Sequence, residues 1–210
     1  MNFNSKSVIE KHAYDLLKDG IKNRDSLFHT LVFSNFDGKD ISNKVMVLRD
    51  FNAAKRTLRF HSDYRSDKAK LIQANSKASV IGYDPNKKIQ LRLTGIAKIN
   101  YKNKKTKEAW NNSQAISKKC YSVLDGSSQK ISNPKKYDFH MKDISIEEGY
   151  ENFCTIEFNF KTLEFLYLQR TGHRRCKFSW NAKGKKESYW LVPEPVSWTR
   201  KPLTSALISS

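Results

Sequence analysis

Cationic and hydroxyl side chains gather where a predicted strand is followed by a predicted helix, at residues 65–68. Arg65 and Lys68 lie close to Ser66 in the sequence. Ser66 is a typical helix N-cap, and the first turn of a helix offers unpaired backbone N–H groups and a partial positive charge. This pattern indicates a binding site for a phosphate group. The alternative is a surface helix whose cations are only solvated.

The elements that would position these groups follow the order strand, turn, strand, helix, strand, turn, strand across residues 43–95. Apolar side chains recur at every second position within runs of β-branched and aromatic residues, which is typical of half-buried strands. They are Val45, Val47, Leu58, Phe60, Val80, Ile89, Leu91 and Leu93. An apolar stripe between the second and third strands predicts a helix that begins after Ser66 and ends at Asn75.

Segments before and after this region predict further helices. Residues 7–22 have the spacing of an amphipathic helix that packs on the sheet, and a helix that carries Trp110 begins near Thr106. We expect Trp110 to anchor a core. Residues 122–149 lack periodicity, which predicts a long loop with a short helix inside it.

More strands are predicted on both sides. Residues 26–38 form a strand that pairs with strand 44–51 as a hairpin. From residue 152, two alternating runs joined by a turn at Lys161 precede the strands RCKFSW and SYWLVP. The sequence therefore predicts one mainly β domain over residues 1–210, an antiparallel barrel with flanking helices. Its C-terminal strands span 150–193.

The charge is strongly positive. The chain has 39 Lys and Arg against 21 Asp and Glu, a formal net charge of +18. Such a charge attracts phosphates, nucleic acids or anionic membrane surfaces without choosing among them. The first residues lack the apolar core of a secretory signal, and no run approaches the ~18 apolar residues of a membrane span. We expect a cytoplasmic protein.

Other chemistry has little support in the sequence. The chain contains no P-loop, dinucleotide-binding, zincin or nucleophile-elbow motif, and its five histidines are isolated. The three cysteines, Cys120, Cys154 and Cys176, form no C-x-x-C pair, so we expect reduced thiols and no metal site.

The order V-M-V-L-R-D-F, F-H-S-D-x-R-S-x-K, Y-D and Q-L-R-L-T-G resembles the FMN-binding core of the pyridoxamine 5'-phosphate oxidase family. The likeness is strongest over residues 44–97 and reappears at 173–175. It implies a six-stranded antiparallel split β-barrel of the FMN-binding type, with FMN bound between two subunits of a homodimer. It also implies oxidation of a small molecule by hydride transfer to the flavin. The R-S-x-K pattern is similar to a branch of the family described only as FMN-binding.

The resemblance assigns roles to individual residues. His173 matches the histidine of the family's substrate segment and is the expected catalytic residue. The residues that match flavin contacts are Lys44, Val45, Met46, Val47, Leu48, Arg49, His61, Ser62, Lys68, Gln90 and Arg175. Strict alternation along one strand would place Lys44 and Arg49 on opposite faces, so one of them must act from a strand end or beyond a bulge.

Departures from the family pattern fall mainly on the substrate side. Asp67 stands where the family has an arginine, which weakens the phosphate site unless Arg65 takes its place. Thr171 replaces a second arginine, and the substrate-phosphate arginine would fall at Ser113 or Gln114. We therefore expect an FMN-dependent oxidoreductase whose substrate is not pyridoxamine 5'-phosphate. The alternatives are a basic barrel that binds nucleic acid without catalysis, and a split barrel that uses F420 or haem or has lost its cofactor.

Overall fold

The computed structural model describes residues 2–36, 38–127, 130–137 and 146–193. Nine strands form one antiparallel sheet in the order β2-β1-β5-β6-β7-β4-β3, with β8 paired to β7 and β9 paired to β8. The strands are β1 (Thr30–Phe36), β2 (Ile41–Val47), β3 (Asp50–Asn52), β4 (Thr57–Asp63), β5 (Lys77–Asp84), β6 (Ile89–Tyr101), β7 (Phe153–Tyr167), β8 (Arg174–Trp180) and β9 (Lys186–Trp190). The sheet curls into a half-barrel, which confirms the predicted fold class, although the strands number nine where six were expected.

The chain crosses from one edge of the sheet to the other between β2 and β3. Strand β2 pairs with β1, whereas β3 pairs with β4. At the crossing, Leu48 N–H donates to the His29 carbonyl at 2.8 Å and Arg49 N–H donates to the Arg59 carbonyl at 2.9 Å. The prediction of one strand over 44–51 is therefore wrong. The break lies between Lys44 and Arg49, so Arg49 acts from beyond a strand end.

A second irregularity lies where β6 meets β7. The register between them shifts between Thr94 and Gly95, so that Lys161 has no partner on β6. A Cβ on Gly95 would collide with the Asn159 carbonyl oxygen, which explains why glycine occupies this position. The turn predicted at Lys161 is wrong: a bulge bends a single continuous strand there.

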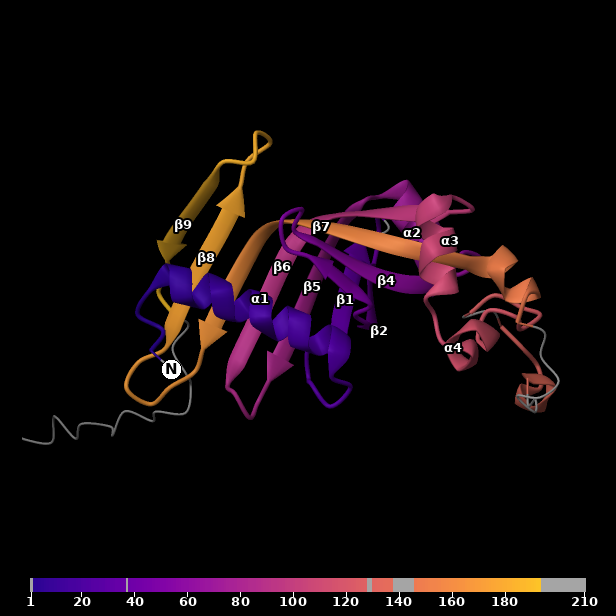
Figure 1. The fold of residues 1–210 in the computed structure, drawn as a ribbon, viewed down its shortest axis with the longest axis horizontal. Coiled ribbons are helices and arrows are strands. Elements are labelled where there is room, and N and C mark those ends of the chain that lie inside the picture. The colour runs from indigo at the N-terminus through magenta and orange to yellow at the C-terminus, as the bar shows by residue number, and fades with distance from the viewer. Residues whose placement is uncertain (1, 37, 128–129, 138–145, 194–210) are drawn as a thin grey trace, which may run out of the picture.

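Helix α1 (Lys6–Lys22) crosses the sheet (Figure 1) and confirms the helix predicted over 7–22. Its buried face enters the same core as the barrel interior, and that core is rich in aromatic rings. Its fully buried phenylalanines include Phe28, Phe33, Phe60, Phe158, Phe160, Phe165 and Phe178. Burying this apolar area is the main stabilising contribution to the fold.

The remaining helices gather at the end of the molecule opposite the β8–β9 hairpin (Figure 1). They are α2 (Asp67–Ala74), α3 (Lys104–Asn111) and α4 (Ala115–Lys119), with short 3₁₀ turns at Pro134–Tyr137 and Glu148–Asn152. The helix predicted from Thr106 onward is broken at residues 112–114, where Asn-Ser sequences favour a turn. Trp110 is buried against Ala109 and Phe153, which confirms it as a core anchor.

Two further features bear on location and chemistry. Among the described residues, no helix is long and apolar enough to cross a membrane. Cys154 and Cys176 are buried and Cys120 is exposed, all as free thiols. No group of three or more His, Cys, Asp or Glu side chains in the described parts of the chain is placed to hold a metal ion.

Candidate functional site

The N-terminus of α2 is built as its sequence predicts. Ser66 caps the helix by accepting a hydrogen bond from Ala69 N–H, and Lys68 follows in the first turn. Burial lowers the pKa of the Lys68 ammonium from its usual value, and the nearby positive charge of Lys44 lowers it further. Lys44 on β2 and Lys68 on α2 are therefore brought together. A dianion placed between them would relieve their repulsion, because it would pair with both cations.

A cavity of about 360 Å³ lies beside Lys68. Ser62, Ser66 and Lys68 line one side of it, and Tyr121 and the chain that follows line the other. The hydroxyls of Ser62 and Ser66 lie 3.4 Å apart within it. The Ser66 hydroxyl already donates to the Asp63 carbonyl at 2.7 Å, so the groups that a phosphate could accept from are the Lys68 ammonium, the Ser62 hydroxyl and the N-terminus of α2.

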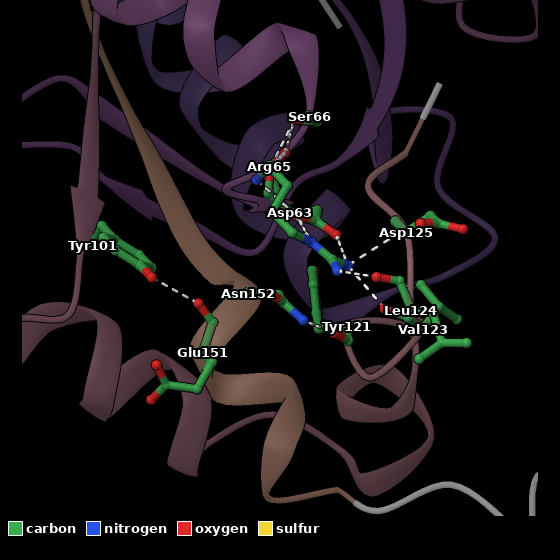
Figure 2. A network of polar contacts seen from close by, with 11 residues as sticks. Asp63, Arg65, Ser66, Tyr101, Tyr121, Val123, Leu124, Asp125, Glu151 and Asn152 are labelled. Carbon is green, nitrogen blue, oxygen red and sulfur yellow. Dashed lines mark hydrogen bonds and ion pairs between the residues drawn. The ribbon is translucent and has the colours of Figure 1, made fainter. Parts of the chain in front are cut away.

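Arg65 lies beside this cavity, and its guanidinium contacts other protein groups (Figure 2). Its guanidinium binds the carboxylate of Asp63 through Nε at 3.1 Å and one terminal nitrogen at 2.8 Å. The same group donates to the carbonyls of Val123, Leu124 and Asp125. The suggestion that Arg65 replaces the arginine lost at Asp67 is therefore wrong, because its donors are committed elsewhere. Arg65 instead neutralises Asp63 and holds residues 123–125 over the cavity.

A second set of contacts fixes the same covering segment. Asn152 donates from its amide to the Tyr121 carbonyl at 2.8 Å, and the Tyr101 hydroxyl donates to the Glu151 carbonyl (Figure 2). The ring of Tyr64, next to Arg65, stacks on Tyr101 with centroids 3.7 Å apart. The end of the barrel is thereby joined to the covering segment from two sides.

Arg49 and His61 face a different cavity, of about 340 Å³, between the barrel and helices α3 and α4. Burial, together with Arg49 and Arg59, lowers the pKa of His61 to about 3. His61 is therefore neutral at physiological pH. Arg24 also lines this cavity and donates to the side-chain oxygen of Gln114 at 2.9 Å. Gln114 is one of the two positions at which the resemblance implied a lost arginine.

Gln90, His173 and Arg175 form a separate group. Gln90 on β6 and Arg175 on β8 are both paired with Leu166 of β7, about 10 Å apart across the sheet. Arg175 binds Glu164 through Nε at 2.9 Å and a terminal nitrogen at 2.8 Å. His173 Nδ1 accepts a hydrogen bond from Gln169 N–H, which leaves Nε2 to carry the proton of the neutral ring.

The two groups lie at opposite ends of β7. Ser62 pairs with Cys154 near its start, whereas Gln90 and Arg175 pair with Leu166 near its end. Twelve residues of strand separate these positions, a distance of roughly 40 Å. Lys44, Ser62 and Lys68 therefore lie at one end of β7, with His61 in the neighbouring cavity, whereas Gln90, His173 and Arg175 lie at the other end. Residues 44–49, which run from β2 into the crossing, lie with the first group.

Several residues of the site are not predicted by the sequence. Asp63, Arg65 and Tyr121 shape the first cavity, and Arg24 and Arg59 line the second. The single signal for Arg59 was its alternation with His61 on one strand, which places both side chains on the same face. No local pattern identifies Arg24 or Tyr121, because both reach the site from segments distant in sequence.

Comparison with known proteins agrees with this architecture. Residues 12–101 match the family model of the pyridoxamine 5'-phosphate oxidase FMN-binding domain. No curated protein sequence shows a significant match. A pyridoxamine 5'-phosphate oxidase-related, FMN-binding protein from Nostoc punctiforme is similar in structure, with 18% identity, a TM-score of 0.71, and coverage of 87% of this chain and 96% of that one.

PhzG from Burkholderia lata, solved in complex with tetrahydrophenazine-1-carboxylic acid, has a TM-score of 0.70 at 13% identity over 91% of this chain and 95% of that chain. A protein from Clostridium acetobutylicum related to general stress protein 26 has a TM-score of 0.54 at 10% identity, over 81% and 95% of the two chains. At these identities the likeness shows a shared fold.

Proposed function

We propose that this chain binds FMN and acts as an oxidoreductase of the pyridoxamine 5'-phosphate oxidase-like family. The match of residues 12–101 to the family's FMN-binding domain model and the shared fold support this proposal. The observation that carries the proposal is the half-buried Lys68 ammonium at the N-terminus of α2. The charge of Lys44 acts on this ammonium and lowers its pKa, and the cavity beside it is also lined by Ser62. Asp63 and Asp125 also line this cavity, and Asp63 is already neutralised by Arg65.

The residues present fit the phosphate and one edge of FMN. Lys44 and Lys68 would hold the phosphate together with Ser62, and the backbone of residues 45–48 would run along the ring system. Arg49 and His61 would complete this end; Arg49 Nε and His61 Nε2 are buried and have no hydrogen-bond partner among the described residues. Bound FMN supplies hydride acceptance and transfer, while the protein supplies binding, orientation and electrostatics.

A complete site needs a second copy of the chain, and we propose a homodimer. Measured along β7, roughly 40 Å of strand separates the position paired with Ser62 from the position paired with Gln90 and Arg175, which supports two ends of the chain acting on different flavins. The β1–β2 hairpin exposes Phe36, Ile41 and Val45, with Ile41 70% and Val45 69% exposed. Apolar side chains gathered on an edge hairpin beside the site are suited to an interface between copies.

We assign substrate contact to His173, which lies near Arg175 at the end of β7 that would enter the site of the partner copy. Its Nε2 proton, directed by the Gln169 contact, can donate a hydrogen bond to a substrate. We further propose a cytoplasmic location.

The arginines that the resemblance leads one to expect at positions 67 and 171 are replaced by Asp67 and Thr171. This supports a substrate other than pyridoxamine 5'-phosphate.

The visible absorption spectrum of the purified protein tests the proposal, with the released cofactor identified by mass and with an FMN titration if the protein is colourless. A flavin spectrum with FMN released, or saturable FMN binding, supports the function. If the released cofactor is F420 or haem, the proposal that the protein binds FMN is wrong and the protein is a split barrel that uses that other cofactor. A colourless protein that ignores all three and binds RNA or DNA in a salt-dependent manner would favour the nucleic-acid alternative.

A further inference from the structure

Strand β6 has one edge that is only partly paired. Along that edge, β5 pairs with residues 89–96, and Ala97 N–H donates to the Ser76 carbonyl at 2.7 Å just before β5 begins. The ladder stops there, because the next position in this register is Ala74, the last residue of helix α2. Strand β6 continues to Tyr101 and is paired there only with β7, on its other edge.

The backbone of β6 beyond Ala97 therefore has polar groups that face outward with no strand beside them. In an antiparallel pair the N–H and C=O groups of successive residues point to opposite edges, so those of Ile99 and Tyr101 point the same way as those of Ala97. Among the described residues, no backbone carbonyl outside the strand ladders accepts from either amide N–H. An unpaired edge of this kind is a template to which another extended chain can add.

A cavity of about 500 Å³ runs along this edge, and we call it the β6-edge groove. Five consecutive residues of β6, 97–101, line it. Because successive side chains point to opposite faces of a sheet, a cavity that touches all five follows the edge of the strand and not one of its faces. Helix α2 forms the opposite wall through Ile72 and Gln73. At ~3.3 Å per residue, the free edge is about 13 Å long, enough for about four residues of an extended chain.

The two sides of the β6-edge groove differ in chemistry. On the side of the barrel interior, Ile72 and Ile99 pack in the hydrophobic core. On the outer face, Lys98 is exposed, and Glu157, which pairs with it on β7, already binds Lys105 through both carboxylate oxygens at 2.8 Å. A strand added beside β6 alternates in the same way, so its apolar side chains would lie toward Ile99 and its polar side chains toward Lys98.

The charge around the β6-edge groove is positive. No aspartate or glutamate is among the described residues that line it, whereas Lys98 is. Lys77 and Lys104 directly follow the lining residues Ser76 and Asn103 in the sequence, and both are exposed. None of these three lysines forms an ion pair within the described part of the chain. The groove therefore suits a partner with carboxylate side chains.

We propose that the β6-edge groove binds an extended peptide segment with alternating apolar and acidic residues, by strand addition. The backbone groups of Ile99 and Tyr101 would supply main-chain hydrogen bonds, which give affinity, and the two sides of the groove would select the side chains. The proposal goes beyond flavin binding, because the groove shares no lining residue with the cavities beside Lys68 and Arg49.

A peptide array tests the proposal on the full-length protein as purified. The probes are peptides of about seven residues, long enough to span the free edge, in which valine or isoleucine alternates with glutamate or aspartate. Versions with lysine at every acidic position test the charge preference. The strongest binder is titrated in solution by fluorescence anisotropy. Two further versions carry N-methyl groups on every second amide, in the two possible phases, which blocks main-chain hydrogen bonds along one edge or the other.

Two variants change the β6-edge groove at exposed side chains, where substitution leaves the core intact. Lys98→Glu reverses the charge that faces the acidic positions, and Gln73→Trp fills the groove from helix α2. Lys18→Glu is the matched control, because it reverses one exposed charge on α1, outside the groove. We expect both groove variants to weaken the strongest binder about tenfold or more, and Lys18→Glu to leave its affinity within about twofold.

Hydrogen exchange of single backbone amides shows how the peptide binds. Strand addition should slow exchange at Ile99 and Tyr101 about tenfold or more, and leave Lys98 and Asn100 unchanged because their amides already face β7. One phase of N-methylation and the lysine version should both abolish binding. The proposal is overturned if no peptide binds at millimolar concentration or if both N-methylated versions bind like the parent peptide. It is also overturned if a second copy of the chain already protects Ile99 and Tyr101 in the peptide-free protein.

Discussion

At the scale of single residues, Lys68 carries most of the argument for a phosphate site. Replacing Lys68 by alanine should weaken FMN binding about 10- to 100-fold, because a charge-assisted contact to a partly buried phosphate is lost. Lys70→Ala is the control: Lys70 belongs to the same helix, but its side chain is 68% exposed and pairs with Asp67. Quenching of flavin fluorescence measures both affinities. Equal losses in the two variants would mean that Lys68 acts only through net charge.

The lowered pKa of Lys68 predicts how FMN affinity depends on pH. Burial and Lys44 make the free ammonium lose its proton below the usual lysine pKa. Affinity should therefore rise as the FMN phosphate becomes a dianion near pH 6, and fall at alkaline pH before an ordinary lysine would titrate. In Lys68→Ala the alkaline fall should disappear. A wild-type affinity that stays constant to pH 10.5 and above would contradict the assignment.

The same shift contributes to folding stability with a defined sign. Since the pKa of Lys68 is lower in the folded than in the unfolded chain, the unfolded chain binds more protons between the two values. The cost of burying the charged group is present at neutral pH and is relieved as pH rises through that window. FMN should relieve the same cost at neutral pH by pairing with the ammonium.

At the scale of elements, the covering segment depends on Arg65. Its guanidinium joins Asp63 to three consecutive carbonyls of residues 123–125. Arg65→Lys keeps the charge but lacks the planar fork needed for these contacts. We expect FMN to dissociate faster from this variant, by about 3- to 30-fold, because one or two charge-assisted contacts are lost. Stopped-flow exchange of bound FMN measures the rate, with Arg170→Lys on an exposed loop as control.

An unchanged dissociation rate in Arg65→Lys would show that the covering segment is held by other contacts. The stacked rings of Tyr64 and Tyr101 and the Asn152 contact to Tyr121 would then be sufficient. In that case, faster FMN release should appear on replacing Asn152 by alanine.

The elements differ in how far the sequence predicts them. Helix α2 follows from its cap and its apolar stripe, because both are local signals. The break after β2 is not predictable from local sequence, because Leu48 N–H donates to the carbonyl of His29, just before β1, whereas Arg49 N–H donates to the carbonyl of Arg59 on β4. The alternation changes phase at Lys161, from buried Phe158 and Phe160 to buried Leu163 and Phe165, and a turn between two strands gives the same change of phase in the sequence. Arg65 contacts the backbone carbonyls of residues 123–125, and because every residue has a backbone carbonyl, the sequence does not reveal these contacts.

At the scale of the whole molecule, the two halves of the expected site lie at opposite ends of strand β7. The family resemblance predicts residues for both halves, but only the pairing of β4, β6 and β8 along β7 shows how far apart these residues are. A site built from two copies has a consequence that a single-chain site lacks. Defects in different halves can be complemented by mixing chains.

The most direct test of the account is therefore FMN binding by mixed dimers of Lys68→Ala and Gln90→Ala chains, produced by co-expression. In each mixed dimer one site carries both substitutions and the other carries neither. With random assembly, about a quarter of all sites should regain wild-type FMN affinity, although each variant alone binds weakly. A co-expressed mixture that binds no more tightly than the two variants measured separately would contradict an FMN site shared between two copies.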